Sequence, residues 1–330
     1  MGASQEELKV ELRRLGRSEV QISVIGLGCW QFSEGFGLAG GFWEALPAET
    51  VQEIVDASLK GGINWFDTAE IYGRGRSERA LAGALTRLGK KPGEVVIATK
   101  WWPVPRGASS IVNTIDERYA CLSPFGIDLH QIHQPFALAT VAAQANAMAD
   151  LVQAGKIKTV GVSNFSAKRM RAAHETLARR GFSLASNQMP YSLLDRRIES
   201  NGVMQACKEL GITLIAYSPL AQGVLSGKFH DDPTLIKKIT GTRKYQPHFW
   251  ASALKRSQPL VDELRKIAAA HGATASQVAL NWLAHFHGET VVVIPGATKR
   301  KHAEENVGAM GFKLTQDELN RIDELSRQFR

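Results

Sequence analysis

The stretches NWFDTAEIY at 64–72 and SERALAGALTRLG at 77–89 decide the fold. In the first, the apolar pair Trp65-Phe66 is followed by the polar pair Asp67-Thr68, as expected of a buried strand that runs into a loop. The second repeats apolar residues at the spacing of an amphipathic helix. VVIATK at 95–100 then starts the same succession again. Strands that alternate with helices in this way predict parallel strands joined by right-handed crossovers.

Outward from this stretch, the change from strand to helix recurs along the chain at a spacing of roughly 30 residues. Eight such units can close into a barrel without an exposed edge, so the sequence predicts a (β/α)8 TIM barrel with an N-terminal β-hairpin and extra C-terminal helices. The competing Rossmann fold needs GxGxxG at its first helix, but GLGCW at 26–30 lacks the third glycine. The expected strands are VQISVIGLG at 20–28, NWFDTAEIY, VVIATK, DLHQIHQP at 128–135, TVGVSNF at 159–165, SLASNQMP at 183–190, TLIAYSPL at 213–220 and VVVIPGA at 291–297.

We expect one barrel domain over residues 1–330, because no Pro/Gly/Ser-rich linker interrupts the repeat. Amphipathic runs at 259–272 and 315–329 predict two helices outside the repeat. The stretches 31–49 and 221–257 exceed the usual length of a connection between strand and helix. Both follow strands, so both are expected on the face of the barrel that carries active sites.

Composition narrows the class of protein. With 44% hydrophobic and 22% charged residues, the 330-residue chain is typical of a globular protein, which excludes disordered, collagen-like and coiled-coil classes. No apolar run approaches the roughly 18 residues of a membrane span, and the charged start lacks the apolar core of a secretory signal, so we expect a cytoplasmic protein. The net charge of +8 is spread along the chain, which disfavours nucleic-acid binding, and no feature defines an oligomeric state. Cys29, Cys121 and Cys207 form no CxxC pair, so neither a disulfide framework nor a zinc site is expected.

Four ionisable residues stand at successive strand ends: Asp67 and Tyr72 after the second strand, Lys100 after the third and His133 after the fourth. The intervals from Asp67 to Lys100 and from Lys100 to His133 are both 33 residues, one repeat of strand and helix. The carboxyl ends of barrel strands share one mouth, so these side chains are expected to meet. Alone, each has an ordinary structural explanation, as a helix cap, a half-buried aromatic, a surface lysine or a core histidine. Their joint register favours a site, and the absence of metal-ligand spacing disfavours a metal.

A phenol, an ammonium, a carboxylate and an imidazole can together move a proton to a carbonyl oxygen. Tyr72 would be the acid. Because a free phenol has a pKa of about 10, the Lys100 ammonium is expected to favour the phenolate, and Asp67 to keep Lys100 charged and in place. A neutral His133 would donate a hydrogen bond that orients the carbonyl.

The ordered motifs of the chain resemble the aldo-keto reductase superfamily over almost the whole length. They are RRLGRSEVQISVIGLGCW, GGINWFDTAEIYGRGRSE, QIHQP, GVSNF, NQMPYS, YSPL and IPGATKRKHAEEN. The family's catalytic tetrad falls on Asp67, Tyr72, Lys100 and His133. The resemblance implies an enzyme that reduces a small aldehyde or ketone by hydride transfer from NADPH, with Tyr72 as general acid. The long loops resemble the branch that includes the potassium-channel beta subunits, so a regulatory subunit that senses the nicotinamide cofactor with little turnover is the alternative.

The resemblance also implies a site for NADPH/NADP+. Ser163, Asn164 and Gln188 offer side-chain hydrogen bonds to the nicotinamide carboxamide, and Tyr217 offers a ring on which nicotinamide can stack. The loops after the seventh and eighth strands are expected to bind pyrophosphate. The other residues carried over are Gly28, Trp30, Ser218, Leu220, Gly223, Gly296 and Thr298, with Lys228 and Arg243 at positions where the longer-loop branch closes over the cofactor.

The last barrel helix departs from the pattern of aldose reductases and hydroxysteroid dehydrogenases. Those proteins carry Lys-Ser after Ile-Pro and an Arg three residues before the Glu of Glu-Asn, where this chain has Gly296-Ala297 and His302. KRK at 299–301 stands instead at the helix start, where N–H groups and cations can bind the adenosine 2′-phosphate. A preference for NADPH over NADH is therefore expected. The residues expected at the adenosine end are Lys299, His302, Glu305 and Asn306, with Lys299 ranked above Arg300 as the phosphate contact.

Several aromatic residues stand at or after strand ends, where they suit an apolar substrate pocket but could equally pack the long loops. They do not indicate which carbonyl compound would enter it. These residues are Trp30, Trp43, Trp101, Trp102, Phe249 and Trp250.

Overall fold

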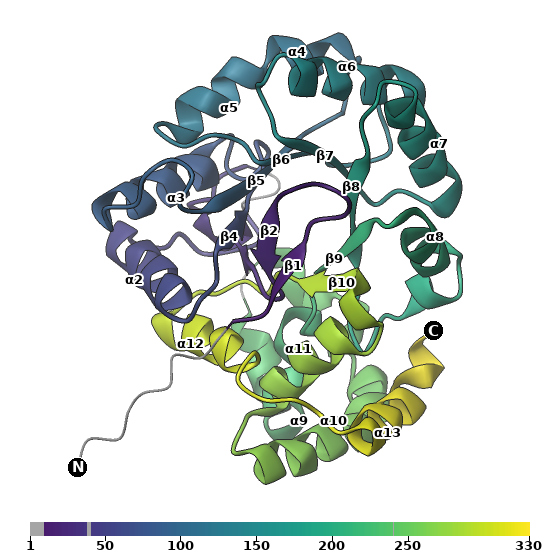
Figure 1. Ribbon diagram of the computed structural model, residues 1–330. Coiled ribbons are helices and arrows are strands. Elements are labelled where there is room, and N and C mark those ends of the chain that lie inside the picture. Colours follow the sequence, from purple (N-terminus) through teal and green to yellow (C-terminus); the bar gives the residue numbers. More distant parts are fainter. Residues whose placement is uncertain (1–9, 38–40, 240) are drawn as a thin grey trace, which may run out of the picture.

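The predicted strands form a closed parallel sheet, which confirms the barrel. The computed structural model describes residues 10–37, 41–239 and 241–330, and it places the eight strands around the sheet in chain order (Figure 1). The sheet closes where Ile25 pairs with Val293 and Gly28 with Gly296. The strands are β3 (Leu27–Gly28), β4 (Trp65–Asp67), β5 (Val96–Trp101), β6 (Leu129–Ile132), β7 (Thr159–Ser163), β8 (Leu184–Pro190), β9 (Thr213–Tyr217) and β10 (Val291–Val293).

The helices of the repeat follow the strands and lie outside the sheet (Figure 1). They are α2 (Ala48–Lys60), α3 (Arg76–Arg87), α4 (Ser109–Asn113), α5 (Ile115–Leu122), α6 (Val141–Gln153), α7 (Ala167–Ala178), α8 (Val203–Leu210), α11 (Ala275–His285) and α12 (Arg300–Gly308). Local sequence starts several of them, as where Thr274 and Gln277 form a capping box at α11. The third unit has two short helices because Thr114 separates them, its hydroxyl donating to Ser110 O (2.7 Å).

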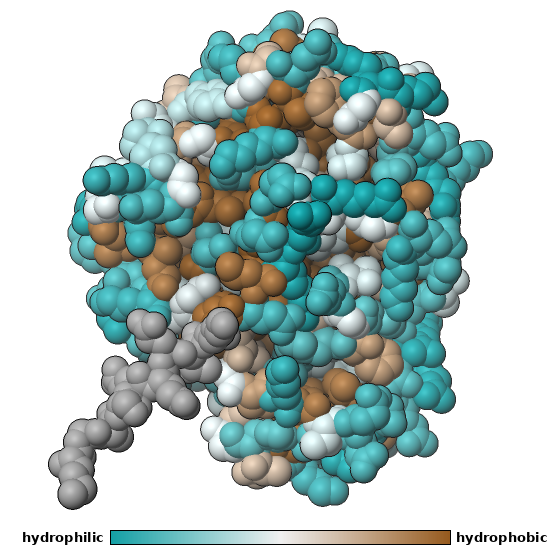
Figure 2. Space-filling view, viewed as in Figure 1, coloured by the Kyte–Doolittle hydropathy of each residue, from teal (hydrophilic) through white to brown (hydrophobic). Residues whose placement is uncertain are grey.

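A hairpin of β1 (Leu12–Arg14) and β2 (Gln21–Ser23) covers the amino end of the barrel, where it lies at the centre of Figure 1. Its Leu15 and Ile22 pack against inward-facing strand residues, among them Trp65. The stretch 20–28, expected to be one strand, divides into β2 and β3, because its first half pairs with β1 and not with the barrel. On this face of the molecule, apolar side chains are exposed between hydrophilic ones (Figure 2).

Within the described residues, the helices outside the repeat are α9 (Lys228–Asp231), α10 (Ala251–His271) and α13 (Gln316–Ser326). The expected start of α10 at residue 259 is wrong, since the helix begins eight residues earlier and contains Pro259. Buried side chains keep helical spacing from Leu254 to Ile267, so their packing outweighs the hydrogen bond that proline cannot donate. In the described parts of the chain, no helix combines the length and apolarity needed to cross a membrane.

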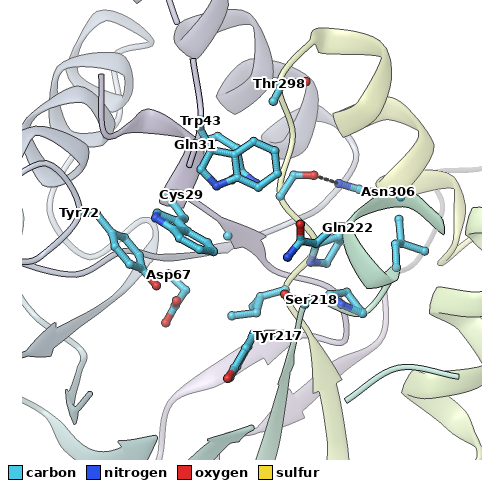
Figure 3. Close-up of a pocket in the computed structure, with 18 of the residues that line it drawn as sticks. Cys29, Gln31, Trp43, Asp67, Tyr72, Tyr217, Ser218, Gln222, Thr298 and Asn306 are labelled. Carbon is cyan, nitrogen blue, oxygen red and sulfur yellow. Dashed lines mark hydrogen bonds between the residues drawn. The ribbon is translucent and has the colours of Figure 1, made fainter. Parts of the chain in front are cut away.

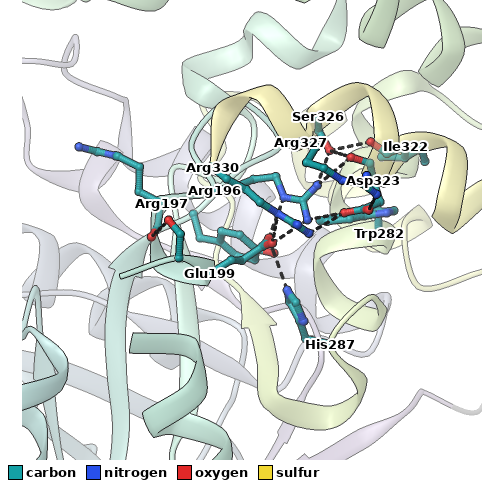
Figure 4. Close-up of polar contacts among 12 residues, drawn as sticks. Arg196, Arg197, Glu199, Trp282, His287, Ile322, Asp323, Ser326, Arg327 and Arg330 are labelled. Atoms are coloured by element: carbon teal, nitrogen blue, oxygen red, sulfur yellow. Dashed lines mark hydrogen bonds and ion pairs between the residues drawn. The ribbon is translucent and has the colours of Figure 1, made fainter. Parts of the chain in front are cut away.

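A buried ionic cluster fixes the last residues to the loop after β8 (Figure 4). The fully buried Arg196 donates to both oxygens of Glu199 (2.7 Å each) and to Asp323 Oδ1 (2.6 Å). Arg330 donates to the same two acids at 2.8 Å. Burial raises the pKa of Glu199, but the His287 imidazole 3.4 Å away and the hydrogen bonds from Arg196 and Tyr191 outweigh burial and hold that pKa well below its ordinary value. The cluster therefore contains a carboxylate that folding keeps ionised.

We expect Glu199→Gln to reduce the free energy of unfolding by about 3 kcal/mol at neutral pH, because it removes one buried partner of Arg196. The folded-state pKa of Glu199 lies below its ordinary value of 4.5, so the stabilisation is present above that value and is lost as the pH falls through the folded pKa. The difference in unfolding free energy between wild type and variant, measured in urea, should therefore shrink as the pH is lowered from neutral toward about 3. A difference that stays constant over this range would contradict the assignment.

Candidate active site

A pocket of about 430 Å³ opens at the carboxyl ends of the barrel strands. Tyr72 and Asp67 lie at one end of it, and Thr298 and Asn306 at the other (Figure 3). Both long loops reach the pocket, as expected, and the Arg243 guanidinium lies 4.3 Å from the ring centre of Trp43. The predicted site residues that line it are Gly28, Trp30, Asp67, Tyr72, His133, Ser163, Asn164, Gln188, Tyr217, Ser218, Leu220, Gly223, Lys228, Arg243, Gly296, Thr298, His302, Glu305 and Asn306.

Two predicted residues are not among the described residues that line the pocket. Lys100, at the end of β5, is fully buried beneath it. Lys299 is an exposed residue directly before α12. Its neighbour Arg300 donates to Glu304 (2.8 Å) and is thereby directed along the helix.

Asp67 lies at the centre of the hydrogen bonds at the Tyr72 end of the pocket. One oxygen, Oδ1, accepts from Lys100 Nζ, which also donates to Thr68 O (2.8 Å). The other, Oδ2, accepts from the side-chain amides of Gln131 (3.0 Å) and Gln188 (2.9 Å). The pairing of Asp67 with Lys100 agrees with expectation. The bonds from these amides to Asp67 were not expected. Gln188 was assigned only to the cofactor, and Gln131 was missed, although it stands two residues before His133 and therefore on the same face of its strand.

Tyr72 stacks on Trp30, with ring centres 5.8 Å apart, and its ring centre lies 5.1 Å from Lys100 Nζ. Burial, then the Asp67 carboxylate, raise the pKa of Tyr72 well above its ordinary value. The Lys100 ammonium therefore does not lower the pKa of the resting Tyr72 phenol, because it is bonded to Asp67 and desolvation dominates. The phenol stays protonated, which is the form that can donate a proton.

His133 is held between two aromatic rings. Its ring meets Tyr72 edge-on at 5.6 Å and Trp102 edge-on at 5.3 Å. Burial, then the Lys100 charge, lower the pKa of His133 well below its ordinary value, so the imidazole is neutral, as expected. Its Nδ1 is buried and has no hydrogen-bond partner among the described residues.

The residues expected to hold nicotinamide form a connected network. Asn164, whose backbone is left-handed at φ +62°, donates to His133 O (3.2 Å) and accepts from Tyr217 OH (3.0 Å). Ser163 Oγ donates to Gln188 O (3.0 Å). The amide nitrogen of Gln188 is bonded to Asp67, so this residue links the network to the Tyr72 end of the pocket.

The other end of the pocket has two cations in its wall, Lys228 and Arg243, beside Glu305. His302 also lines it, and burial, then the Lys228 charge, lower the pKa of that imidazole. The chain after β9 turns tightly there through left-handed residues, including Gln222 (φ +56°) and Gly223 (φ +95°). Such turns present backbone N–H groups to an anion. Arg243 Nε and Gln222 Oε1 are buried without a hydrogen-bond partner in the described parts of the chain. Cations and unsatisfied polar atoms together fit a phosphate-bearing cofactor.

The aromatic prediction holds for half of its residues: Trp30, Trp43 and Trp102 line the pocket. It is wrong for Trp101, which is 1% exposed and whose Nε1 donates to Ser110 Oγ (3.1 Å) behind the strand. It is also wrong for the pair at the end of the second loop. Phe249 is buried against Phe229, and Trp250 is 59% exposed to solvent.

Sequence reasoning missed several polar residues in the pocket wall. Gln31 packs against Gly296, where a Cβ would lie 2.2 Å from its amide, so a larger residue at that position would displace the Gln31 side chain. The other missed polar residues are Cys29, Gln134, Gln222, Ser226 and Ser276. Within the described residues, no three His, Cys, Asp or Glu side chains lie together as metal ligands.

A closed barrel with a phenol, a neutral imidazole and a carboxylate–ammonium pair at the mouth has the fold and site of an oxidoreductase. The family model described as Aldo/keto reductase family matches residues 24–327, and the chain belongs to this family. The recognition made from the motifs is thereby confirmed.

Named relatives and solved structures agree with this membership. An uncharacterized oxidoreductase of Mycobacterium tuberculosis is 38% identical over 310 residues, covering 94% of this chain and 91% of the relative. The chloroplastic pyridoxal reductase of Arabidopsis thaliana is 32% identical over 321 residues, covering 94% of this chain and 84% of the relative. The solved glycerol dehydrogenase of Gluconobacter oxydans superposes with a TM-score of 0.81 at 27% identity, covering 96% of this chain and 95% of the other.

Proposed function

We propose that the protein is an NADPH-dependent reductase of small aldehydes or ketones, with Tyr72 as the general acid. The observation that carries the proposal is a protonated Tyr72 phenol beside the neutral His133 imidazole, in the same pocket as Lys228 and Arg243. Proton donation and cofactor binding are thus available within one cavity.

The residues in the pocket fit the cofactor from end to end. Ser163, Asn164 and Tyr217 would hold the nicotinamide, and Gln188 would contribute its amide oxygen because its nitrogen is bonded to Asp67. The turn at 218–223 and the residues Gly296 and Thr298 would hold the pyrophosphate. When bound, NADPH would supply the hydride.

The protein's own residues would manage the proton. His133 would donate a hydrogen bond to the carbonyl oxygen, and Tyr72 would transfer its proton to that oxygen as negative charge develops. Asp67 would hold the Lys100 ammonium in place, so that a cation faces the phenolate left behind. Trp30, Trp43 and Trp102 would exclude water from the reacting atoms and accept an apolar or planar substrate.

A single-turnover experiment tests the proposal. The protein with bound NADPH is mixed rapidly with a panel of aldehydes, including pyridoxal because one relative is a pyridoxal reductase. We expect oxidation of the bound cofactor by at least one aldehyde, and none in Tyr72→Phe on the same timescale. Tight NADPH binding without oxidation by any aldehyde or ketone would instead favour the regulatory subunit that senses the cofactor.

We also expect a preference for NADPH over NADH that depends on Lys299. A charge-assisted hydrogen bond contributes roughly 1.5–3 kcal/mol, so Lys299→Ala should weaken NADPH binding by about 10-fold or more and leave NADH affinity unchanged. Arg300→Ala is the matched control, because Arg300 has the same charge and is bonded to Glu304. Dissociation constants measured by fluorescence titration decide the matter, and equal losses for both cofactors would refute the assignment.

A further inference from the structure

Glu70 occupies the turn between β4 and Tyr72 and is only 9% exposed. Its Oε1 accepts hydrogen bonds from the backbone N–H of Trp102 and from the Arg106 guanidinium. Its Oε2 lies 3.3 Å from Arg118 Nη1. These contacts fix the loop after β5 to the turn that precedes Tyr72.

The backbone of Glu70 joins the same two loops a second time. Its N–H donates to Lys100 O (3.3 Å), and its carbonyl accepts from Gly75 N (2.9 Å), which closes the turn that presents Tyr72. One residue therefore fixes the segment that carries Tyr72 to the segment that carries Lys100 and Trp102.

His133 depends on these two segments for its orientation. No hydrogen bond to its ring occurs among the described residues, and Nδ1 is buried without a partner. What holds the ring is the pair of edge-on contacts, with Tyr72 at 5.6 Å and Trp102 at 5.3 Å. Glu70 bonds directly to the backbone of Trp102 and is two residues from Tyr72.

We propose that Glu70 is a positioning residue that sets the spacing of Tyr72 and Trp102 and thereby the orientation of the His133 imidazole. It touches neither the pocket nor the reacting atoms, since it is not among the described residues that line the cavity. Its influence on rate rests on the proposed reductase function, whereas its influence on the imidazole does not.

An amide cannot replace this carboxylate. Glu70 accepts from Trp102 N–H and Arg106 through one oxygen and faces Arg118 with the other. In Glu70→Gln, one of these positions becomes an NH2 group that repels a guanidinium, so the amide must turn away from either Trp102 or Arg118. Glu199→Gln is the matched control, because Glu199 is also a buried carboxylate paired with arginines and is not among the described residues in the pocket wall.

The test combines a spectroscopic readout with kinetics. The imidazole signals of His133 are assigned by NMR through loss in His133→Asn and then compared among wild type, Glu70→Gln and Glu199→Gln. We expect Glu70→Gln to shift the His133 signals, because ring-current shielding by Tyr72 and Trp102 changes, and Glu199→Gln to leave them in place. Because misplacement by about 1 Å can cost about 100-fold in rate, kcat should fall by 10- to 100-fold while the NADPH dissociation constant stays within twofold of wild type.

Each outcome decides the proposal. Unshifted His133 signals in folded Glu70→Gln, or a kcat within twofold of wild type, overturn it. If Glu70→Gln does not fold, Glu70→Asp keeps the charge but withdraws the carboxylate from Trp102 N–H, and it must shift the same His133 signals for the proposal to stand. If the wild type reduces no carbonyl compound, the proposed function fails, and the NMR comparison still decides the role of Glu70.

Discussion

Tyr72→Phe should lower kcat for carbonyl reduction by at least about 100-fold, the usual contribution of a general acid. Phenylalanine keeps the ring that stacks on Trp30 and meets His133 edge-on, so the pocket should keep its shape. Only the proton donor is lost, because Tyr72 has the only hydroxyl among the four residues of the tetrad.

Rapid-mixing measurement of the hydride-transfer step, with NADPH affinity determined in parallel, separates chemistry from binding. In Tyr72→Phe, we expect an unchanged dissociation constant for NADPH and a slow hydride-transfer step. Near wild-type turnover with a simple aldehyde would show that another group, or water, delivers the proton.

Lys100→Met should abolish most activity and also destabilise the fold. Lys100 is fully buried, and its ammonium is the cation bonded to Asp67, so its removal leaves Asp67 with two amide donors and no positive charge. Removing one partner of a buried ion pair costs about 3–5 kcal/mol. The loss of the charge that faces a developing phenolate should lower kcat by at least about 100-fold.

The double variant Lys100→Met with Asp67→Asn separates the two effects. Without the unpaired carboxylate, it should recover much of the free energy of unfolding, while kcat stays low because no cation remains beneath Tyr72. Recovery of both stability and kcat in the double variant would mean that the pair serves folding alone.

The barrel and the positions of the tetrad could be predicted from the sequence because both depend on local patterns. Each strand and helix has its own periodicity, and strand ends in a parallel barrel meet at one mouth whatever the loops do. Asp67, Lys100 and His133 therefore follow from the register alone.

Contacts between distant strands could not be predicted in the same way. Gln188 bonds to Asp67 across 121 residues of chain, and no local pattern distinguishes that use of its amide from a bond to a cofactor. Trp101 and Trp102 show a second limit. Successive residues of a strand point to opposite sides. Trp101, the last residue of β5, points away from the pocket, and Trp102, directly after it, lines the pocket. Which of the two faces the pocket depends on where the strand ends.

The pKa shifts of buried groups could not be predicted from the sequence either. Whether Lys100 lowers the pKa of Tyr72 or burial raises it depends on the geometry of a single ammonium, which bonds to Asp67 and Thr68 O. The start of α10 depends likewise on packing, since buried side chains extend the helix through Pro259.

The hairpin closes the amino end of the barrel. With Leu15, Ile22 and Trp65 filling that end, a ligand in the pocket can enter and leave only on the opposite face, past the loops there. The hairpin face is therefore the face on which the protein can be attached without covering the pocket. If the protein were attached to a surface or to another protein through the exposed turn at Glu19, ligands could still enter and leave the pocket.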